Sequence, residues 1–580
     1  MHSRHTIHTF SPPPSRNVPA YATVHRDTVK RVLDAMIEVE PPPPWPFNPH
    51  IFVFGLDQCN HWQVAVNSKK GHFRGAERLN NQGMPIHIRS ETVVNSAQRH
   101  VPFTLGMLTP DEVKLIREKG PYTEDYSNVL AALEPVVVKK QLWEGMEEML
   151  ELVEDTFKEL DGVLSTREAE RRISEDLLGR PKHPGGKTQI HIPPSIPNCD
   201  TKAFKDVFKF IPFLVSYCML SMICLVVHAD GQTVEILRAC KRRWPLEYKP
   251  VVIAQGYFHA LVHFIFCINF GFWQPLLCTF AAWLHKDKQI YEEMKDLQND
   301  NATHALDFHR VSSAGILCYL LLSVKNPPPS LFVSDPQLYL TMVNQGGIAI
   351  IQYLLHGGSP ILRYQRAIRM GKGYICRQMM AYSVHVHRSL AFKTKSVLIN
   401  MTCLMGMCCT HPKIQQVLEV SGSISLFGDF MMAFDRFIEY INNLQLKRAT
   451  AFRGYDTQLC FTKYLKALVH VDAVWKEVDG PGHRLDDGIP SYLYNDIAQI
   501  HRKLVETLGT DLTVASLGNP LWHTGIPVPL NGGDYRKREP WTYIWEVALG
   551  RSAGWGRSLT EAKHWRIWAR KWYSESMFPM

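Results

Sequence analysis

Two short apolar runs separated by a helical pattern dominate the middle of the sequence. The first, residues 225–227, ends in His228-Ala229-Asp230, and from Thr233 the apolar residues recur at helical spacing. The second run, residues 251–254, follows almost at once. This pattern predicts a strand, a helix and a second strand, the βαβ unit of a parallel sheet. Asp230 is then expected at the carboxyl end of the first of these strands, where open α/β sheets carry their chemistry, although Asp-Gly is also a common turn.

An earlier apolar run, residues 51–56, ends at Asp57 and predicts another strand with an acidic residue at its end. Residues 63–66 and 84–88 have the composition of two further strands, separated by a polar segment rich in Gly and Asn. Three sequential strands joined by turns predict an antiparallel meander. We therefore expect all five strands to form one mixed sheet.

Helical periodicity continues from Ile265 to about Val420, interrupted by Pro-rich and Gly-rich loops. Arg363, Arg369 and Arg377 in this block suggest a basic, nucleic-acid-binding face, with an ordinary solvated surface as the alternative. The sequence thus predicts five segments. They are a Pro-rich linker with a short helix (1–50), a sheet core (51–264), a helical insertion (265–425), a helix with a third acidic residue (426–450) and a helical, Trp-rich carboxyl-terminal region (451–580).

The third acidic residue has two candidates in one helical pattern. Asp435 and Glu439 are four residues apart, which places them on the same face of a helix. Asn442 follows Glu439 at the next helical position on that face. Both acids also have the plain interpretation of solvated surface residues.

The order of these motifs resembles that in a family of proteins. The motifs are the strand with Asp57, the turn Asp230-Gly231-Gln232, the Gly256-x-x-His259 after the next strand, and the late Glu439-x-x-Asn442. The arrangement is similar to the ribonuclease-H-like core of cut-and-paste DNA transposases of the hAT and Mutator kind. It resembles more closely an uncharacterised, transposase-derived eukaryotic family. The resemblance implies an α/β fold: a ribonuclease-H-like mixed sheet, a large all-helical insertion and a helical carboxyl-terminal region.

The resemblance also implies a catalytic site. Asp57, Asp230 and Glu439 would be the catalytic acids and the metal ligands, with Asp435 as an alternative third ligand. His259, Asn442 and Gln232 would be further site residues. Phosphoryl transfer on DNA uses two divalent ions, and Mg2+ or Mn2+ prefers carboxylate oxygens, so three converging acids are the expected ligand set. DNA is the expected partner, a nuclear location follows from it, and self-association stays open.

Composition narrows the class of protein without naming a partner. With 45% hydrophobic and 21% charged residues the chain is globular, and its net charge of +9 over 580 residues permits nucleic-acid binding without requiring it. Thirteen cysteines without CxxC spacing predict reduced thiols in an intracellular protein with no secreted partners. The sequence has no recognisable DNA-binding module, which leaves open an active transposase and a domesticated or inactive copy. A non-enzymatic nucleic-acid-binding or interaction scaffold of the same fold is the alternative.

A membrane protein is the second alternative. Residues 211–227 are an uncharged apolar run at the lower limit for crossing a bilayer, and residues 251–284 are poor in charge. The first run ends in His228-Ala229-Asp230 and is followed by a basic helix without aromatic residues typical of membrane interfaces. An interior strand explains this pattern better than a membrane span does.

Overall fold

The computed structural model describes most of the chain between residues 47 and 510. The described ranges are 47–63, 89–123, 127–158, 165–179, 220–284, 302–323, 353–389, 394–425, 431–449 and 491–510, with short pieces at 78–79, 85–86 and 188–193 and scattered residues between 181 and 218 and at 350. The predicted amino-terminal helix, residues 64–66 and the Trp-rich region after residue 510 lie outside the described residues.

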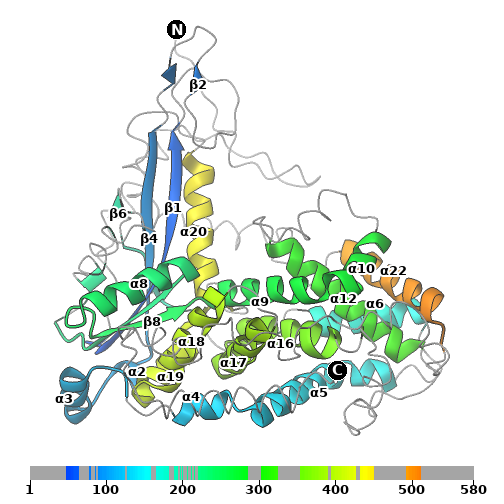
Figure 1. Cartoon of the computed structure of the whole chain (residues 1–580), viewed down its shortest axis with the longest axis horizontal. Coiled ribbons are helices and arrows are strands. Elements are labelled where there is room, and N and C mark those ends of the chain that lie inside the picture. The colour runs from blue at the N-terminus through cyan, green and yellow to red at the C-terminus, as the bar shows by residue number, and fades with distance from the viewer. Residues whose placement is uncertain are drawn as a thin grey trace, which may run out of the picture.

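A mixed sheet forms the centre of the fold (Figure 1). Its strands are β1 (Ile51–Gln63), β4 (Arg89–Arg99), β5 (Ile190–His191), β7 (Cys224–Ala229) and β8 (Val251–Gln255), in the order β5-β4-β1-β7-β8, and β6 (Ile196–Pro197) also pairs with β4. β1 is antiparallel to β4 and parallel to β7, and β7 is parallel to β8. The antiparallel strands β1, β4 and β5 are thus combined with a parallel βαβ unit, and the apolar pattern predicted the βαβ unit.

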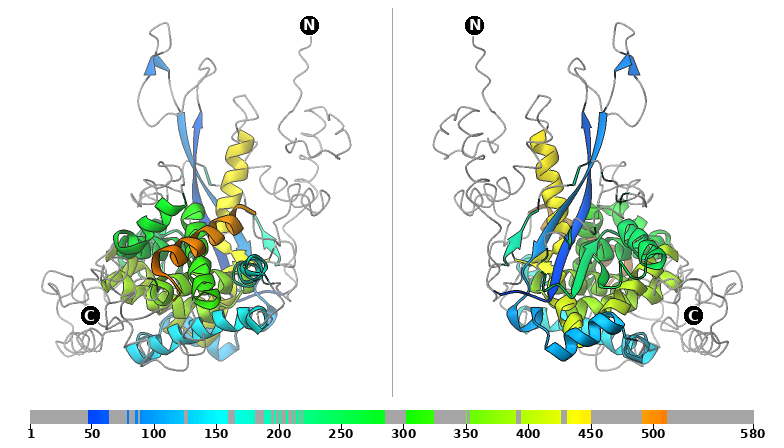
Figure 2. Two further views of the ribbon diagram at one scale, coloured as in Figure 1. Left: turned by 90° about the vertical axis from the view of Figure 1, so that its right-hand side faces the viewer. Right: turned by 90° about the vertical axis from the view of Figure 1, so that its left-hand side faces the viewer.

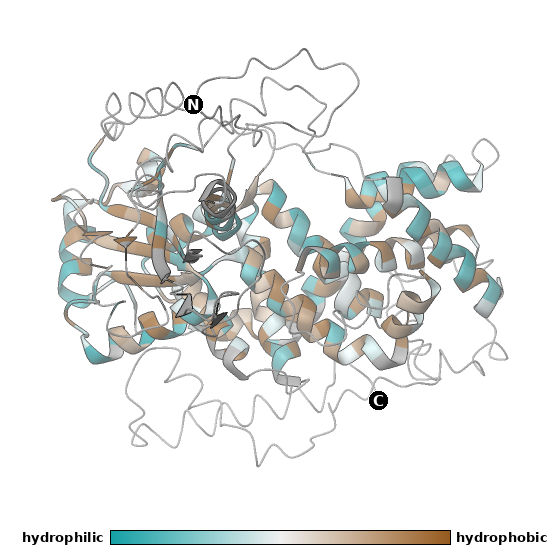
Figure 3. Cartoon of the chain, turned by 90° about the horizontal axis from the view of Figure 1, so that it is seen from above, coloured by the Kyte–Doolittle hydropathy of each residue, from teal (hydrophilic) through white to brown (hydrophobic). Residues whose placement is uncertain are grey.

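Alternating side chains give the sheet two apolar faces, which different helices cover. Phe52 and Phe54 of β1 pack with Val234 and Leu237 of α8 (Gly231–Arg243) on one face. On the other face α20 (Phe434–Ala449) lies along β1 and β4, and both views of Figure 2 show it beside these strands. Figure 3 shows apolar strands within the sheet, whereas the helices carry both apolar and polar residues. Residues i and i+2 of one strand share a face, so the sequence alone specifies both faces of β1.

Two of the five predicted strands require correction. Gln63 is the last residue of β1, not the first residue of a second strand. Within residues 84–88, the described pair Pro85–Ile86 forms a strand (β3), which pairs with β2 (Arg78–Leu79) outside the central sheet. The second strand of the sheet is β4, which the sequence analysis missed because Arg89–Arg99 is mostly polar. The predicted strands at residues 225–228 and 251–254 are confirmed.

Helices make up most of the remaining described chain. Before the βαβ unit they are α2 (Phe103–Gly106), α3 (Pro110–Lys119), α4 (Ser127–Ala132), α5 (Pro135–Lys158) and α6 (Thr166–Leu178). After it come α9 (Tyr257–Phe272), the π-helix η2 (Trp273–Leu277), α10 (Cys278–Trp283), α12 (Ala302–Leu322), η3 (Leu354–Gly358), α16 (Ser359–Met370), α17 (Gly373–Ser389), α18 (Thr394–Cys408), α19 (Pro412–Ser421) and α22 (Ser491–Leu508). A short hairpin of β9 (Ser423–Ile424) and β10 (Met432–Ala433) leads into α20.

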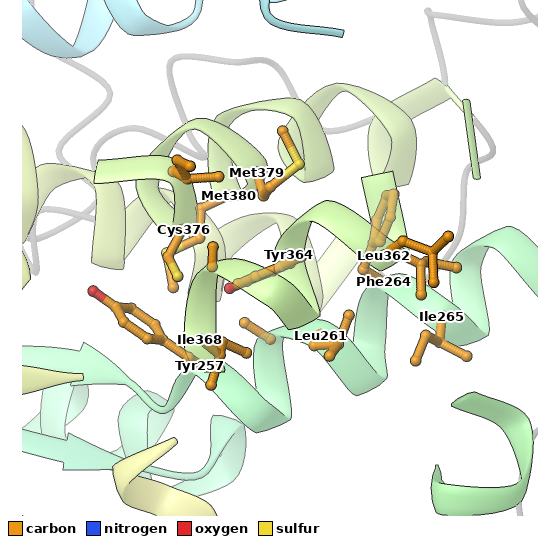
Figure 4. Close-up of a cluster of buried hydrophobic side chains, with 14 of the residues drawn as sticks. Tyr257, Leu261, Phe264, Ile265, Leu362, Tyr364, Ile368, Cys376, Met379 and Met380 are labelled. Atoms are coloured by element: carbon orange, nitrogen blue, oxygen red, sulfur yellow. The ribbon is translucent and has the colours of Figure 1, made fainter. Parts of the chain in front are cut away.

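One continuous hydrophobic core joins these helices to the sheet. Tyr257 and Leu261 of α9 face Ile368 of α16 and Cys376 of α17 within this core (Figure 4). α9 starts at the carboxyl end of β8, and its first residues therefore connect the sheet edge to the helical part of the molecule.

The three arginines named above have partners within the protein. Arg363 donates to both carboxylate oxygens of Glu148 at 2.9 and 3.0 Å, and Arg377 pairs with Glu419 at 2.7 Å. Arg369 donates to the carbonyl of Leu178. These guanidinium groups connect helices within the protein and are therefore occupied by internal partners. The described cysteines are all free thiols, as predicted.

The end of the apolar run at residues 211–227 is an interior strand, as the sequence favoured. From Cys224 the run lies in the buried strand β7 at the centre of the sheet, and residues 251–255 are strand β8. Within the described ranges, one helix is long and apolar enough to cross a membrane, at His304–Leu322 in α12, and 89% of its apolar window is buried inside the molecule.

Candidate functional site

Asp57 and Asp230 extend from neighbouring strands at the same level of the sheet. β1 and β7 are parallel with Gly55 opposite His228, so each acid lies two residues beyond this paired position. Adjacent strands are about 4.8 Å apart, which places the two acids side by side. Asp230 is the N-cap of α8, and its Oδ1 accepts a hydrogen bond from the Thr233 amide at 2.8 Å. Asp57 was expected at the end of a strand, but β1 continues to Gln63 and Asp57 is in its interior.

α20 brings the third acidic position to this part of the sheet. Phe434 and Ile438 of α20 are the nearest side chains above Gly55, and Asp57, two residues on, shares that face of β1. Asn442 is one turn beyond Ile438, and its Nδ2 donates to Asp57 Oδ2 at 2.8 Å. The Oδ1 of Asn442 accepts from Asn95 Nδ2, on β4, at 2.6 Å.

Asp435 forms hydrogen bonds with the start of α9. Its carboxylate accepts from the backbone amides of Phe258 and His259 at 3.2 and 2.8 Å, and its side chain is only 4% exposed. These amides have no partner within α9, so Asp435 stabilises the amino terminus of that helix. Asp435 therefore has a structural role, and the alternative assignment of it as third metal ligand loses its support.

His259 connects both acids of α20. Its Nδ1 lies 2.8 Å from Asp435 Oδ2, and its Nε2 lies 3.2 Å from Glu439 Oε1. Glu439 is the more accessible of the two acids, with 33% of its side chain exposed. Both ring nitrogens of His259 therefore lie against carboxylates.

The charges of this cluster shift one another's protonation. Burial raises the pKa of Asp57 to about 7, and nearby Asp230 and Glu439 add to the rise. Burial also raises the pKa of Glu439, with contributions from Asp435 and Asp230. Burial disfavours the charged imidazole of His259, but Asp435 and Glu439 outweigh it and raise its pKa to about 10. Burial opposes ionisation of Asp435 as well, yet its contacts with His259 hold its pKa below the usual range.

The structure thus gathers most of the predicted site residues in one place. Asp57, Asp230, Glu439 and His259 influence one another electrostatically, and Asn442 contacts Asp57 directly. Gln232, in the first turn of α8, has an exposed side chain. Asn95 was not among the predicted site residues. It lies in a mostly polar stretch that does not show the apolar pattern of a strand, so nothing in the sequence indicates that Asn95 faces the site.

The three acids have the right ligand chemistry for a hard divalent cation, but their side chains are not placed to bind one ion together. Asp57, Asp230 and Glu439 offer only oxygen ligands, the type that Mg2+ and Mn2+ prefer. Among the described residues, however, no three His, Cys, Asp or Glu side chains are placed to hold one metal ion together. Asp57 and Asp230 are neighbours on parallel strands, whereas Glu439 is engaged by His259. A cation site here would be built on the two aspartates, and Glu439 would have to turn from His259 to join them.

Comparison with known proteins adds no relative: no family model matches the chain, and no match is found among the curated proteins or the solved structures.

Proposed function

We propose that this chain is a transposase-like protein with a ribonuclease-H-like core, which binds Mg2+ or Mn2+ through Asp57 and Asp230 and acts on DNA. Glu439 is the proposed third ligand. The observation that carries the proposal is the position of Asp57 on β1 beside Asp230, which directly follows the parallel neighbouring strand β7, beneath a late helix that carries a third acid. The antiparallel meander followed by a βαβ unit is the sheet topology expected of such a core. A nuclear location is part of the same proposal.

Mutual repulsion between the acids supports a role for cations. The raised pKa of Asp57 reflects burial and the nearby Asp230, and a bound cation would offset this repulsion. Divalent ions at such a site activate an attacking oxygen and stabilise a leaving one in phosphoryl transfer. The chain's own contribution is positional. Asp230 is fixed by its hydrogen bond to the Thr233 amide, and Asp57 is held by Asn442.

A non-enzymatic scaffold of the same fold is the second candidate. The contact between His259 and Glu439 favours it, because this contact holds the third acid on an imidazole and away from the aspartate pair. Such a protein would keep the cation site and lack the reaction.

Calorimetric titration with Mn2+ tests the site. Wild type should bind Mn2+, and Asp57→Asn or Asp230→Asn should weaken binding at least tenfold. Asn also serves as an N-cap, so Asp230→Asn preserves the start of α8. Asp176→Asn is the control, because Asp176 is a partly buried acid on α6 whose pKa burial likewise raises. Binding indifferent to both site variants would refute the assignment.

A nicking assay on supercoiled DNA then separates the two candidates. Cleavage that requires Mg2+ or Mn2+ and is lost in Asp57→Asn supports the enzyme. Cation binding without cleavage by any variant supports the scaffold.

A further inference from the structure

Asn95 is a buried amide that lies directly opposite Asp57. The two residues are paired in the antiparallel register of β1 and β4, and directly opposed residues place their side chains on the same face of a sheet. The side chain of Asn95 is fully buried. α20 crosses this face, so that Asn442 lies over both residues.

Asn442 links the two sheet residues through opposite ends of its amide. Its Nδ2 donates to Asp57 Oδ2 at 2.8 Å, and its Oδ1 accepts from Asn95 Nδ2 at 2.6 Å. A carboxamide has one donor end and one acceptor end, whereas an ionised carboxylate only accepts. Turning the Asn442 amide over would set its oxygen against Asp57 and its NH2 group against the Asn95 donor. With its NH2 group facing Asn442, Asn95 therefore favours the orientation of Asn442 that suits an ionised Asp57.

We propose that Asn95 is a positioning residue of the cation site, which acts on Asp57 through Asn442. This relay, from Asn95 through Asn442, holds Asp57 Oδ2 from the side of α20. The backbone amide of Gln58 donates a hydrogen bond to Asp57 Oδ1 at 2.7 Å. A carboxylate offers about four lone-pair positions, so both oxygens keep capacity to bind an ion in a fixed direction. Partners that orient a metal ligand in this way are worth about 10–100-fold in metal affinity. The inference rests on the proposed function, because it takes Asp57 as a cation ligand.

The test compares Mn2+ affinity among variants of the full chain. Asn95→Leu keeps the approximate volume of the side chain and removes its donor, and it should weaken binding about tenfold. The same substitution in an Asn442→Leu background should have no further effect, because the relay is already broken. Ser96→Ala is the matched control. Ser96 is the next residue of β4, is equally buried, faces the other side of the sheet, and its hydroxyl has no hydrogen-bond partner among the described residues. Its affinity should equal that of wild type.

The double-variant comparison separates positioning from a general effect on folding. If Asn95 only stabilised the fold, its loss and that of Asn442 would reduce affinity independently and the effects would multiply. That result, or wild-type affinity in Asn95→Leu, overturns the proposal. Asn95→Ser is the second variant should Asn95→Leu fail to fold. It is shorter, cannot span the distance to Asn442, and should show the same tenfold loss.

The outcome for Asn95 is distinguishable from that for the site as a whole. Wild-type binding that does not depend on Asp57 or Asp230 overturns the proposed function, and the role of Asn95 with it. Asp57-dependent binding that is unaffected by Asn95→Leu overturns the role of Asn95 alone.

Discussion

Gly256 and Asp435 touch where β8 passes into α9. A Cβ atom on Gly256 would lie 2.0 Å from Cγ of Asp435, closer than any real contact between these atoms. Gly256 is the N-cap of α9. Asp435 accepts hydrogen bonds from the backbone amides of Phe258 and His259, which lie two and three residues further along the chain. Glycine is therefore required at position 256 by the close approach of α20, although its backbone angles are accessible to any residue.

Replacing Gly256 should destabilise the protein. In Gly256→Ala the new methyl group displaces Asp435 from its two amide donors, at a cost of about 3 kcal/mol in the free energy of unfolding. Urea denaturation measures this cost. The control is Gly406→Ala in α18, where a Cβ would meet its nearest neighbour at 3.6 Å. Because alanine favours a helix interior, this control should be neutral or more stable by about 0.5–1 kcal/mol. Equal stability of the two variants would argue against the close approach.

The two acids of α20 should differ in their effect on stability. Asp435→Asn removes a buried charge that accepts from two amides and from His259, and should cost about 3 kcal/mol. Glu439→Gln removes a partly exposed charge and should cost less than about 1 kcal/mol. Denaturation at pH 7 ranks them. A larger loss in Glu439→Gln would reverse the structural and functional roles assigned here.

His259 should make stability depend on alkaline pH. Its pKa is raised from 6.5 to about 10 in the folded protein, so the folded state holds the proton more tightly than the unfolded state. The resulting stability is fully present below pH 6.5 and is lost as the pH rises towards 10. The free energy of unfolding of wild type relative to His259→Gln should therefore decrease between pH 6 and pH 9. Parallel pH profiles of the two proteins would show that folding leaves the pKa of His259 unchanged.

Arg436 offers a test of where DNA binds. It is exposed on α20, its guanidinium lies 5.1 Å from the centre of the Phe258 ring, and it affects the pKa of Glu439. If DNA occupies the proposed site, Arg436→Gln should reduce the slope of log affinity against log salt by about 1. Arg243→Gln on α8 is the control, since Arg243 is an exposed arginine against the Trp244 ring, on the helix that covers the other face of the sheet. Equal changes in both variants would indicate binding spread over the surface.

The βαβ unit and its acid were predictable because their signals are local. The strands β7 and β8 are buried on both faces, and their residues 225–227 and 251–254 are therefore apolar without interruption. Asp230 precedes a helix and caps it, which is a relation between residues close in sequence. The same holds for the spacing of Asp435, Glu439 and Asn442 along one face of α20.

Only the tertiary structure decided that residues 89–99 form strand β4 and that Asp435 and Glu439 of α20 have different roles. Asn95, Ser96, Gln98 and Arg99 are buried polar residues of β4. Distant segments supply the partners of two of them: Asn442 accepts from Asn95, and the carbonyls of Val420 and Ser423 accept from Arg99. Polarity along the sequence therefore gave no strand signal. Asp435 and Glu439 are equivalent in periodicity, and the approach of α20 to Gly256 selects Asp435 for the start of α9 and leaves Glu439 the more accessible. Sequence periodicity determined which residues share a helix face, and packing against β8 and α9 determined what each of them does, because that contact joins residues about 180 positions apart.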